Sequence, residues 1–117
     1  MAAKLARLPF WCAVLVTLWF AWTPEPPAIL PSDKAEHGLA FVVLVPLLVL
    51  AYPRLGWIAV AAILAAFGAL IEIVQGVPGI HRDADIHDWI ADVIAIVVAL
   101  AALRFARWIA ARHRRRA

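Results

Sequence analysis

The sequence is short of charged residues and has almost no cysteine. Charged residues make up 16% of the 117 residues and hydrophobic residues 66%, whereas a typical soluble domain is about 25% charged and about 45–50% apolar. A soluble domain of this size could not bury that much apolar surface in one core. The shortage of charge therefore excludes an ordinary soluble protein and favours a membrane protein. The single cysteine, Cys12, excludes an internal disulfide.

Long apolar runs are also missing, because the few charges divide the chain into four short spans. These spans cover about 8–24, 38–53, 55–71 and 86–103, each somewhat shorter than the roughly 20 residues that cross a bilayer in a straight helix. Short spans are accommodated by interfacial residues at their ends or by local thinning of the bilayer. The sequence predicts an all-α fold, namely one domain over residues 1–117 that forms an integral membrane bundle of four transmembrane helices.

The chain lacks the usual catalytic signatures. It contains no HExxH motif, no pair of cysteines and no nucleophile elbow. Its only side-chain hydroxyls are those of Thr17, Thr23, Ser32 and Tyr52. A serine or cysteine nucleophile is therefore disfavoured, no cofactor or bound metal is predicted, and an enzymatic activity stays an open question.

The first span has the basic start of a signal peptide, with Lys4 and Arg7 before an apolar stretch. The segment that follows, WFAWTPEPP, offers no small-x-small cleavage site. We expect a retained helix.

The charges are distributed unevenly between the two ends of the predicted bundle. Nine of the eleven Lys and Arg residues lie at the termini or in the 52–56 turn, and all eight acidic residues lie toward the opposite end. The positive-inside rule then predicts cytoplasmic termini in a multi-pass protein of the plasma (inner) membrane. The basic tail, 104–117, suits anionic lipid headgroups as partners and does not call for nucleic acid.

Two stretches place ionisable residues at the mouths of apolar spans: SDKAEHGLAF (32–41) and HRDADIHDWIAD (81–92). Helix capping explains part of this pattern, since Asp33 with Glu36 resembles a capping box and Asp85 suits an N-cap. It does not explain Lys34, because a cation opposes the helix dipole in the first turn. Nor does it explain His37, which shares a helical face with Asp33 and Lys34.

One carboxylate, Asp92, falls inside an apolar span and another, Glu72, directly at the end of one; ionisable residues placed this deep usually face a polar interior. Glu72 precedes Gln75 by one turn, and Asp92 shares a helical face with Asp85 and Asp88. The alternative is that these carboxylates are simply hydrated at headgroup level. If Glu72 and Asp88 face each other, either one of them takes up a proton or a cation lies between them. The candidate cations are Lys34, Arg82 and His37, and Arg82 is favoured because its guanidinium can bind carboxylates bidentately.

Taken together, these motifs resemble the VanZ-like membrane proteins over about residues 30–100. The shared pattern is Asp-Lys-x-x-His in 33–37, Glu-x-x-Gln in 72–75, then Arg82, Asp85 and Asp88. Asp92 stands where the family usually has Asn, and Ala95 and Ala99 stand where it usually has glycines. The resemblance implies a role at the cell envelope, with a link to glycopeptide (teicoplanin-type) resistance.

We therefore expect the helix ends to converge outside the membrane on a polar cluster that binds or handles an envelope-facing polar ligand. Its predicted members are Asp33, Lys34, His37, Glu72, Gln75, Arg82, Asp85, Asp88 and Asp92. Two alternatives stay open. The cluster could be an interhelical salt-bridge network in a structural or accessory subunit, or His37 with Glu72, Asp88 and Asp92 could hold a divalent cation in a small metal-assisted enzyme. The oligomeric state is not readable from the sequence.

Overall fold

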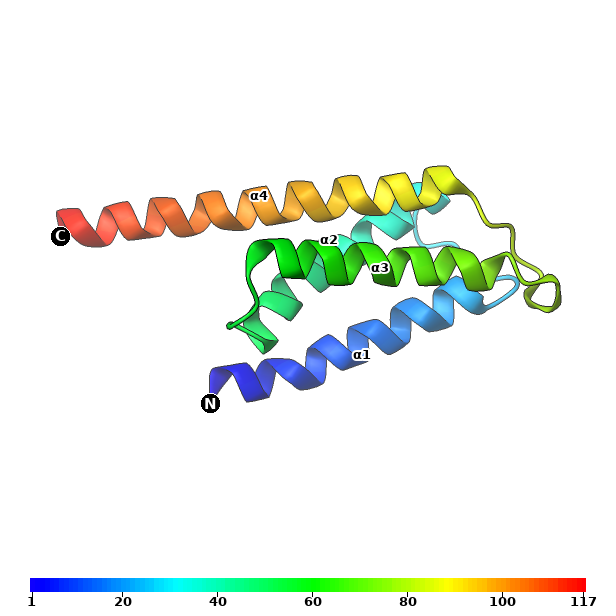
Figure 1. Ribbon diagram of the computed structural model, residues 1–117, viewed down its shortest axis with the longest axis horizontal. Helices are drawn as coiled ribbons and strands as arrows, with labels where there is room; N and C mark the ends of the chain where they lie inside the picture. Colours follow the sequence, from blue (N-terminus) through cyan, green and yellow to red (C-terminus); the bar gives the residue numbers. More distant parts are fainter.

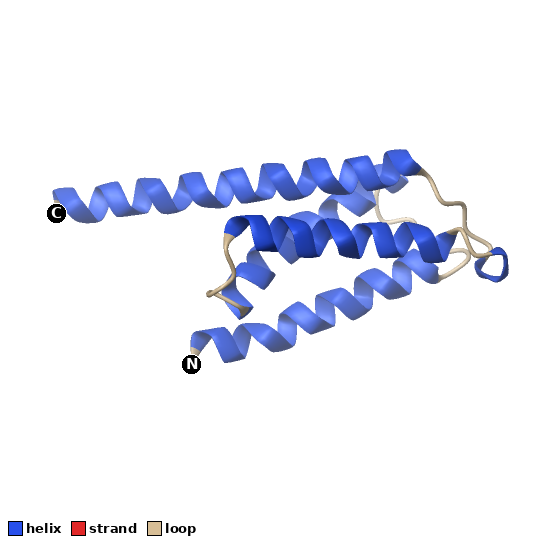
Figure 2. Ribbon diagram, viewed as in Figure 1, coloured by secondary structure: helices blue, strands red, loops and turns tan.

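The computed structural model describes residues 1–117 and contains helices but no strands (Figure 2). Its four long helices are α1 (Ala2–Trp22), α2 (Asp33–Ala51), α3 (Trp57–Gln75) and α4 (Ile86–Arg116), with a short 3₁₀ helix, η1 (Pro78–Ile80), before α4. All four long helices are long and apolar enough to cross a membrane. The all-helical prediction with four candidate spans is confirmed.

The helices extend further than the apolar spans suggested. α1 starts at Ala2 rather than near residue 8, and α4 runs through the basic tail to Arg116 instead of ending near 103. Alanine and arginine are good helix formers, and four basic residues in the last turn of α4 suit the negative end of its dipole. The tail is therefore a helical extension that projects beyond the other helices (Figure 1).

The second helix is the centre of the bundle. α2 packs most extensively against α4 and α1, while α3 packs chiefly against α4 (Figure 1). Phe41, Leu44 and Val45 of α2 are fully buried in this core. A Cβ built on Gly38 would lie 3.9 Å from the Cβ of Ala95, so two small residues bring α2 close to α4.

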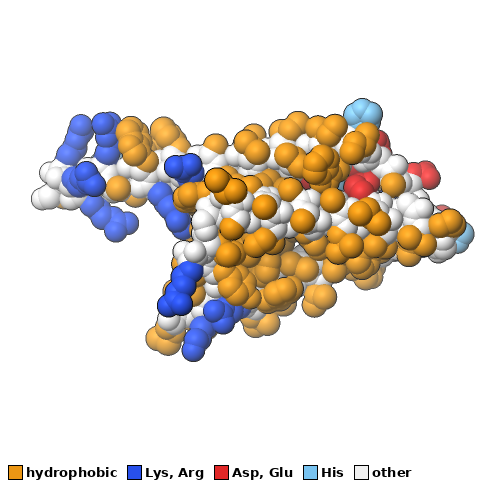
Figure 3. Space-filling model, in the orientation of Figure 1, with side chains coloured by type: hydrophobic (Ala, Val, Ile, Leu, Met, Phe, Trp, Pro, Cys, Tyr) orange, Lys and Arg blue, Asp and Glu red, His pale blue; other side chains and the backbone are white.

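The two ends of the bundle differ in charge, as Figure 3 shows, with Lys and Arg gathered at the end that carries both termini and acidic side chains at the other. At the basic end the guanidinium groups of Arg104 and Arg107 lie over the ring of Trp57, at 5.6 and 5.2 Å from its centroid. At the acidic end lie the loop 23–32 and the loop 76–85. This second end assembles the predicted polar residues.

Candidate functional site

The start of α2 departs from the predicted capping box. Ser32, not Asp33, is the N-cap, and its hydroxyl accepts a hydrogen bond from the Ala35 N–H. Glu36 instead accepts hydrogen bonds from the backbone N–H groups of Ile29 and Leu30, at 2.6 and 2.9 Å. The capping-box interpretation is wrong because the helix starts one residue earlier than predicted, so Ala35 and not Glu36 is the third helical residue. Glu36 is therefore free to hold the preceding loop.

The start of α4 follows the prediction. Asp85 is the N-cap, and its Oδ1 accepts a hydrogen bond from the His87 N–H at 2.9 Å. That backbone hydrogen bond is the main reason why the pKa of Asp85 lies below its usual value, with further contributions from the His87 ring and Lys34. A charged Asp85 therefore stabilises the first turn of α4.

Lys34 links the start of α2 to the start of α4. Its Nζ lies 3.0 Å from Asp88 Oδ1 and 3.4 Å from Asp85 Oδ2. The predicted role of Arg82 as the counter-ion of Glu72 and Asp88 is wrong, because Arg82 makes no ion pair. Lys34 takes that role for Asp88, since it projects directly across the α2–α4 contact.

Below this pair lies a buried group of three side chains from three helices: His37 of α2, Glu72 of α3 and Asp92 of α4. His37 Nδ1 lies 3.3 Å from Asp92 Oδ1 and 4.0 Å from Glu72 Oε1. One ligand-type atom from each residue falls within 4.8 Å of the other two. The three are hereafter called the His–Glu–Asp trio. The structure therefore brings together His37, which the sequence placed at the mouth of a span, and the carboxylates of Glu72 and Asp92.

The carboxylate oxygens of the trio accept few hydrogen bonds. Asp92 is 0% exposed, and neither of its oxygens accepts a hydrogen bond from any group of the chain. Glu72 uses Oε2 to accept a hydrogen bond from the Asp85 N–H at 3.0 Å, which ties α3 to the start of α4, but its Oε1 has no donor. Buried carboxylates are normally paired or coordinate a metal, so these oxygens require an explanation.

Room for Asp92 is provided by a residue that the sequence did not single out. A Cβ on Gly68 would lie only 3.0 Å from Asp92 Oδ2 and 3.4 Å from Trp89 Cδ1. Gly68 sits four residues before Glu72, on the same helical face. That spacing is the signal that could have identified it.

Gln75, also predicted as a site residue, has a structural contact. It is buried, and its Nε2 donates a hydrogen bond to the Ala21 carbonyl at 2.7 Å. The amide thereby satisfies a carbonyl in the last turn of α1 and joins α1 to α3.

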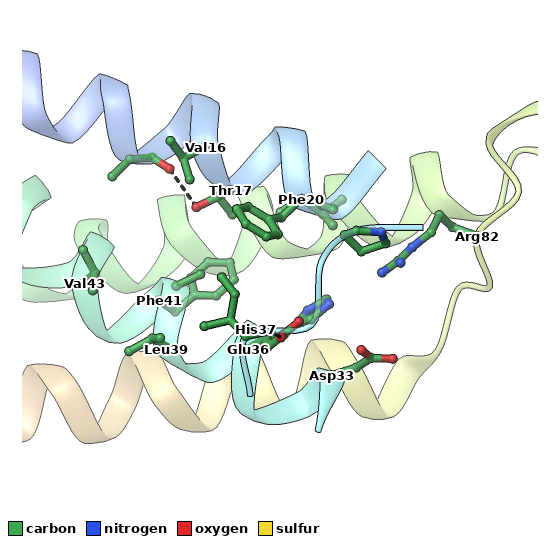
Figure 4. A pocket seen from close by; sticks show the side chains of 16 residues that line it. Val16, Thr17, Phe20, Asp33, Glu36, His37, Leu39, Phe41, Val43 and Arg82 are labelled. Atoms are coloured by element: carbon green, nitrogen blue, oxygen red, sulfur yellow. Dashed lines mark hydrogen bonds between the residues drawn. The ribbon is translucent and has the colours of Figure 1, made fainter. Parts of the chain in front are cut away.

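The remaining predicted residues, Asp33 and Arg82, line a cavity of about 240 Å³ between α1 and α2. Arg82 reaches toward this cavity from the loop before α4, while Thr17 and Phe20 approach it from α1 (Figure 4). His37 also lines it, whereas Glu72 and Asp92 do not, so the trio meets the cavity through His37 alone. No pattern in the sequence pointed to residues of α1, because their apolar side chains resemble those of any other apolar helix face.

The cavity has a mostly apolar wall and a polar end. Its apolar lining includes Val16, Leu39 and Val43, which are also partly exposed on the outer surface of the bundle. The cavity therefore opens sideways, between α1 and α2, as well as toward the acidic end.

No protein-family model, curated protein or solved structure matches the chain. The resemblance to the VanZ-like proteins stays a prediction, and the geometry of this end of the bundle is the basis for the function.

Proposed function

We propose that the chain is a multi-pass plasma-membrane protein that binds an anionic amphiphile of the cell envelope in the α1–α2 cavity. Both termini would lie in the cytoplasm and the acidic end would face outward, as the positive-inside rule favours. The observation that carries the proposal is a laterally open apolar cavity with an arginine outside any ion pair at its polar end.

The side opening favours a lipid-like occupant over a water-soluble one. Val16, Leu39 and Val43 line the cavity and are exposed on the face that would meet lipid chains, so an apolar tail could enter from the bilayer. At about 240 Å³ the cavity is smaller than the roughly 300–1,000 Å³ of drug-sized sites. It would hold part of one tail, and the rest would lie along α1 and α2.

The polar end favours an anionic headgroup. Arg82 lines the cavity and makes no ion pair, and a guanidinium binds phosphate or carboxylate oxygens bidentately. Asp33 and Glu36 also line the cavity and would accept hydrogen bonds from hydroxyls of the same headgroup. An anionic, hydroxylated headgroup fits this combination.

Native mass spectrometry of the detergent-purified protein tests the proposal, with phosphatidylglycerol as the anionic probe and phosphatidylcholine as the zwitterionic one. We expect retention of one phosphatidylglycerol. Arg82→Gln should reduce it about fivefold, the effect of about 1 kcal/mol per interfacial cation. Arg54→Gln, at the opposite end, is the matched control.

A second pair of variants tests the cavity itself. Ala40 lines the cavity, so Ala40→Leu should fill it and abolish retention of either lipid. Ala62→Leu adds the same side chain at an exposed position of α3 and should leave retention unchanged. Equal retention by all four variants would reject the binding function and leave the alternative of a structural subunit held by the Lys34 and Gln75 contacts.

The resemblance to the VanZ-like proteins adds an expectation at the level of the cell. A protein that sequesters or moves an envelope amphiphile would alter the response to drugs that act on the outer envelope, including teicoplanin-type glycopeptides. Expression in a susceptible bacterium should then raise the inhibitory concentration of teicoplanin, and Ala40→Leu should cancel the rise at equal protein abundance.

A further inference from the structure

The His–Glu–Asp trio has an excess of negative charge that the chain does not neutralise. Its two carboxylates face one histidine, so the net charge is −1 with a protonated His37 and −2 with a neutral one. Lys34, at the start of α2, is already paired with Asp88 and Asp85 at 3.0 and 3.4 Å, and no Lys or Arg lies within ion-pair distance of Glu72 or Asp92. Uncompensated charge in a low-dielectric interior is costly, so the trio requires a further cation or a further proton.

The atoms are placed as metal ligands would be. The 3.3 Å between His37 Nδ1 and Asp92 Oδ1 is close to the separation of neighbouring ligands that each lie about 2.1 Å from one ion. Glu72 Oε1 lies 4.0 Å from the same nitrogen. Both this oxygen and the oxygens of Asp92 lack a hydrogen-bond donor, so their lone pairs are available.

We infer that the trio binds one divalent transition-metal ion, with His37, Glu72 and Asp92 as its protein ligands. One imidazole and two carboxylates form a mixed nitrogen and oxygen set, which suits Zn²⁺ or Mn²⁺ better than Ca²⁺ or a thiolate-preferring ion. With a neutral His37, a divalent ion brings the charge of the trio to zero. Three protein ligands leave a coordination position for water or a ligand oxygen.

The surroundings support the binding site. His37 also lines the α1–α2 cavity, which gives an ion a route to the trio. The second carboxylate oxygen of Glu72 accepts the Asp85 N–H, and this hydrogen bond orients the carboxylate as outer contacts commonly do around metals. Gly68 leaves the space that Asp92 occupies.

Metal content and thermal unfolding test the inference. The protein is purified in detergent through a histidine-free tag, stripped with a chelator, and re-equilibrated with Zn²⁺ or Mn²⁺. We expect about one tightly bound ion per chain and a rise in the melting temperature of about 5 °C or more with metal. Asp92→Asn should reduce bound metal at least tenfold and remove the rise. Asp83→Asn, at an exposed loop carboxylate, is the control and should behave as the wild type.

The chelated proteins distinguish a metal site from a plain ion pair. If the metal is the missing cation, chelated Asp92→Asn should melt at or above chelated wild type, because one uncompensated buried charge is gone. If His37 and Asp92 form only a structural ion pair, Asp92→Asn should melt lower, with no metal effect on the wild type, and this result would overturn the inference. Metal bound equally by Asp92→Asn and wild type would also overturn it. None of these measurements involves lipid, so they are independent of the proposed binding function.

Discussion

The burial of Asp92 depends on the residues packed against it. Seven residues into α4, Asp92 has mainly apolar neighbours on its own helix apart from Asp88, one turn earlier. The packing of α2 and α3 against it leaves Asp92 fully buried. Gly68 makes that cover possible, since any side chain at this position would occupy the space beside Asp92 Oδ2, Phe41 and Trp89. The residue without a side chain is therefore as much a part of the site as the charged ones.

We expect Gly68→Ala to destabilise the protein. The new Cβ would lie 3.0 Å from Asp92 Oδ2 and 3.3 Å from Phe41 Cζ, and overpacking of this kind costs about 1–3 kcal/mol. The better helix propensity of alanine, about 1 kcal/mol, offsets only part of this cost. Gly38→Ala is the matched control, because its Cβ would meet Ala95 at an ordinary 3.9 Å and should not lower stability. Thermal unfolding in detergent measures both, and an equal loss in the two variants would contradict the argument.

Sequence reasoning identified which ionisable residues gather at the acidic end of the bundle better than it identified which of them pair. His37, Glu72 and Asp92 were recognisable as ionisable residues among apolar ones, and the structure brings them together. Arg82 was assigned to the carboxylates because it has the stronger binding geometry, yet Lys34 makes the contact. The relative rotation and register of packed helices decide such pairings, and a single helix sequence does not contain that information.

At the scale of the helices, the N-termini of α2 and α4 are held differently. The α4 start has a strong cap, with the Asp85 carboxylate 2.9 Å from the His87 N–H. The cap at the α2 start is weaker, since Ser32 Oγ lies 3.4 Å from the Ala35 N–H, and the loop before it is held by Glu36 instead. Local sequence rules identified the Asp85 cap but missed Ser32 because Asp33 is an equally good capping residue.

The lowered pKa of Asp85 predicts a pH-dependent stability. The charged form of Asp85 is favoured in the folded protein, chiefly by the His87 N–H. The stability that this charge contributes is therefore fully present above the ordinary Asp pKa of 3.8. It is lost as the pH falls through the lower pKa that Asp85 has in the folded protein. Asp85→Asn keeps a capping oxygen that does not titrate.

The melting-temperature difference between wild type and Asp85→Asn should therefore favour the wild type at pH 6 and be smaller at pH 3. Asp85→Ala removes the cap and should melt lower than Asp85→Asn at both pH values. A wild-type advantage of the same size at pH 3 and pH 6 would show that the charge of Asp85 does not contribute.

For the whole molecule, the organising feature is the separation of charge along the bundle axis. The end with both termini carries the arginines of α4 and the 52–56 turn, and the opposite end carries the acidic loops (Figure 3). The positions of the charged residues along the sequence were enough to predict this arrangement, because an even number of spans must return the chain to its starting side. The cavity between α1 and α2 was not predictable, since it depends on how closely two apolar helices pack.

The charge separation predicts the orientation of the chain in the membrane. Nine of the eleven basic residues lie at the terminal end, and short loops rich in Lys and Arg are retained in the cytoplasm. A reporter that is active only outside the plasma membrane should therefore be inactive when fused after Ala117 and active when inserted at Pro78, in η1 between α3 and α4. A cytoplasm-dependent fluorescent reporter at the same two positions is the control and should give the opposite pattern. Activity of the external reporter after Ala117 would place the acidic end, its cavity and the trio on the cytoplasmic side, where an outer-envelope ligand could not reach them.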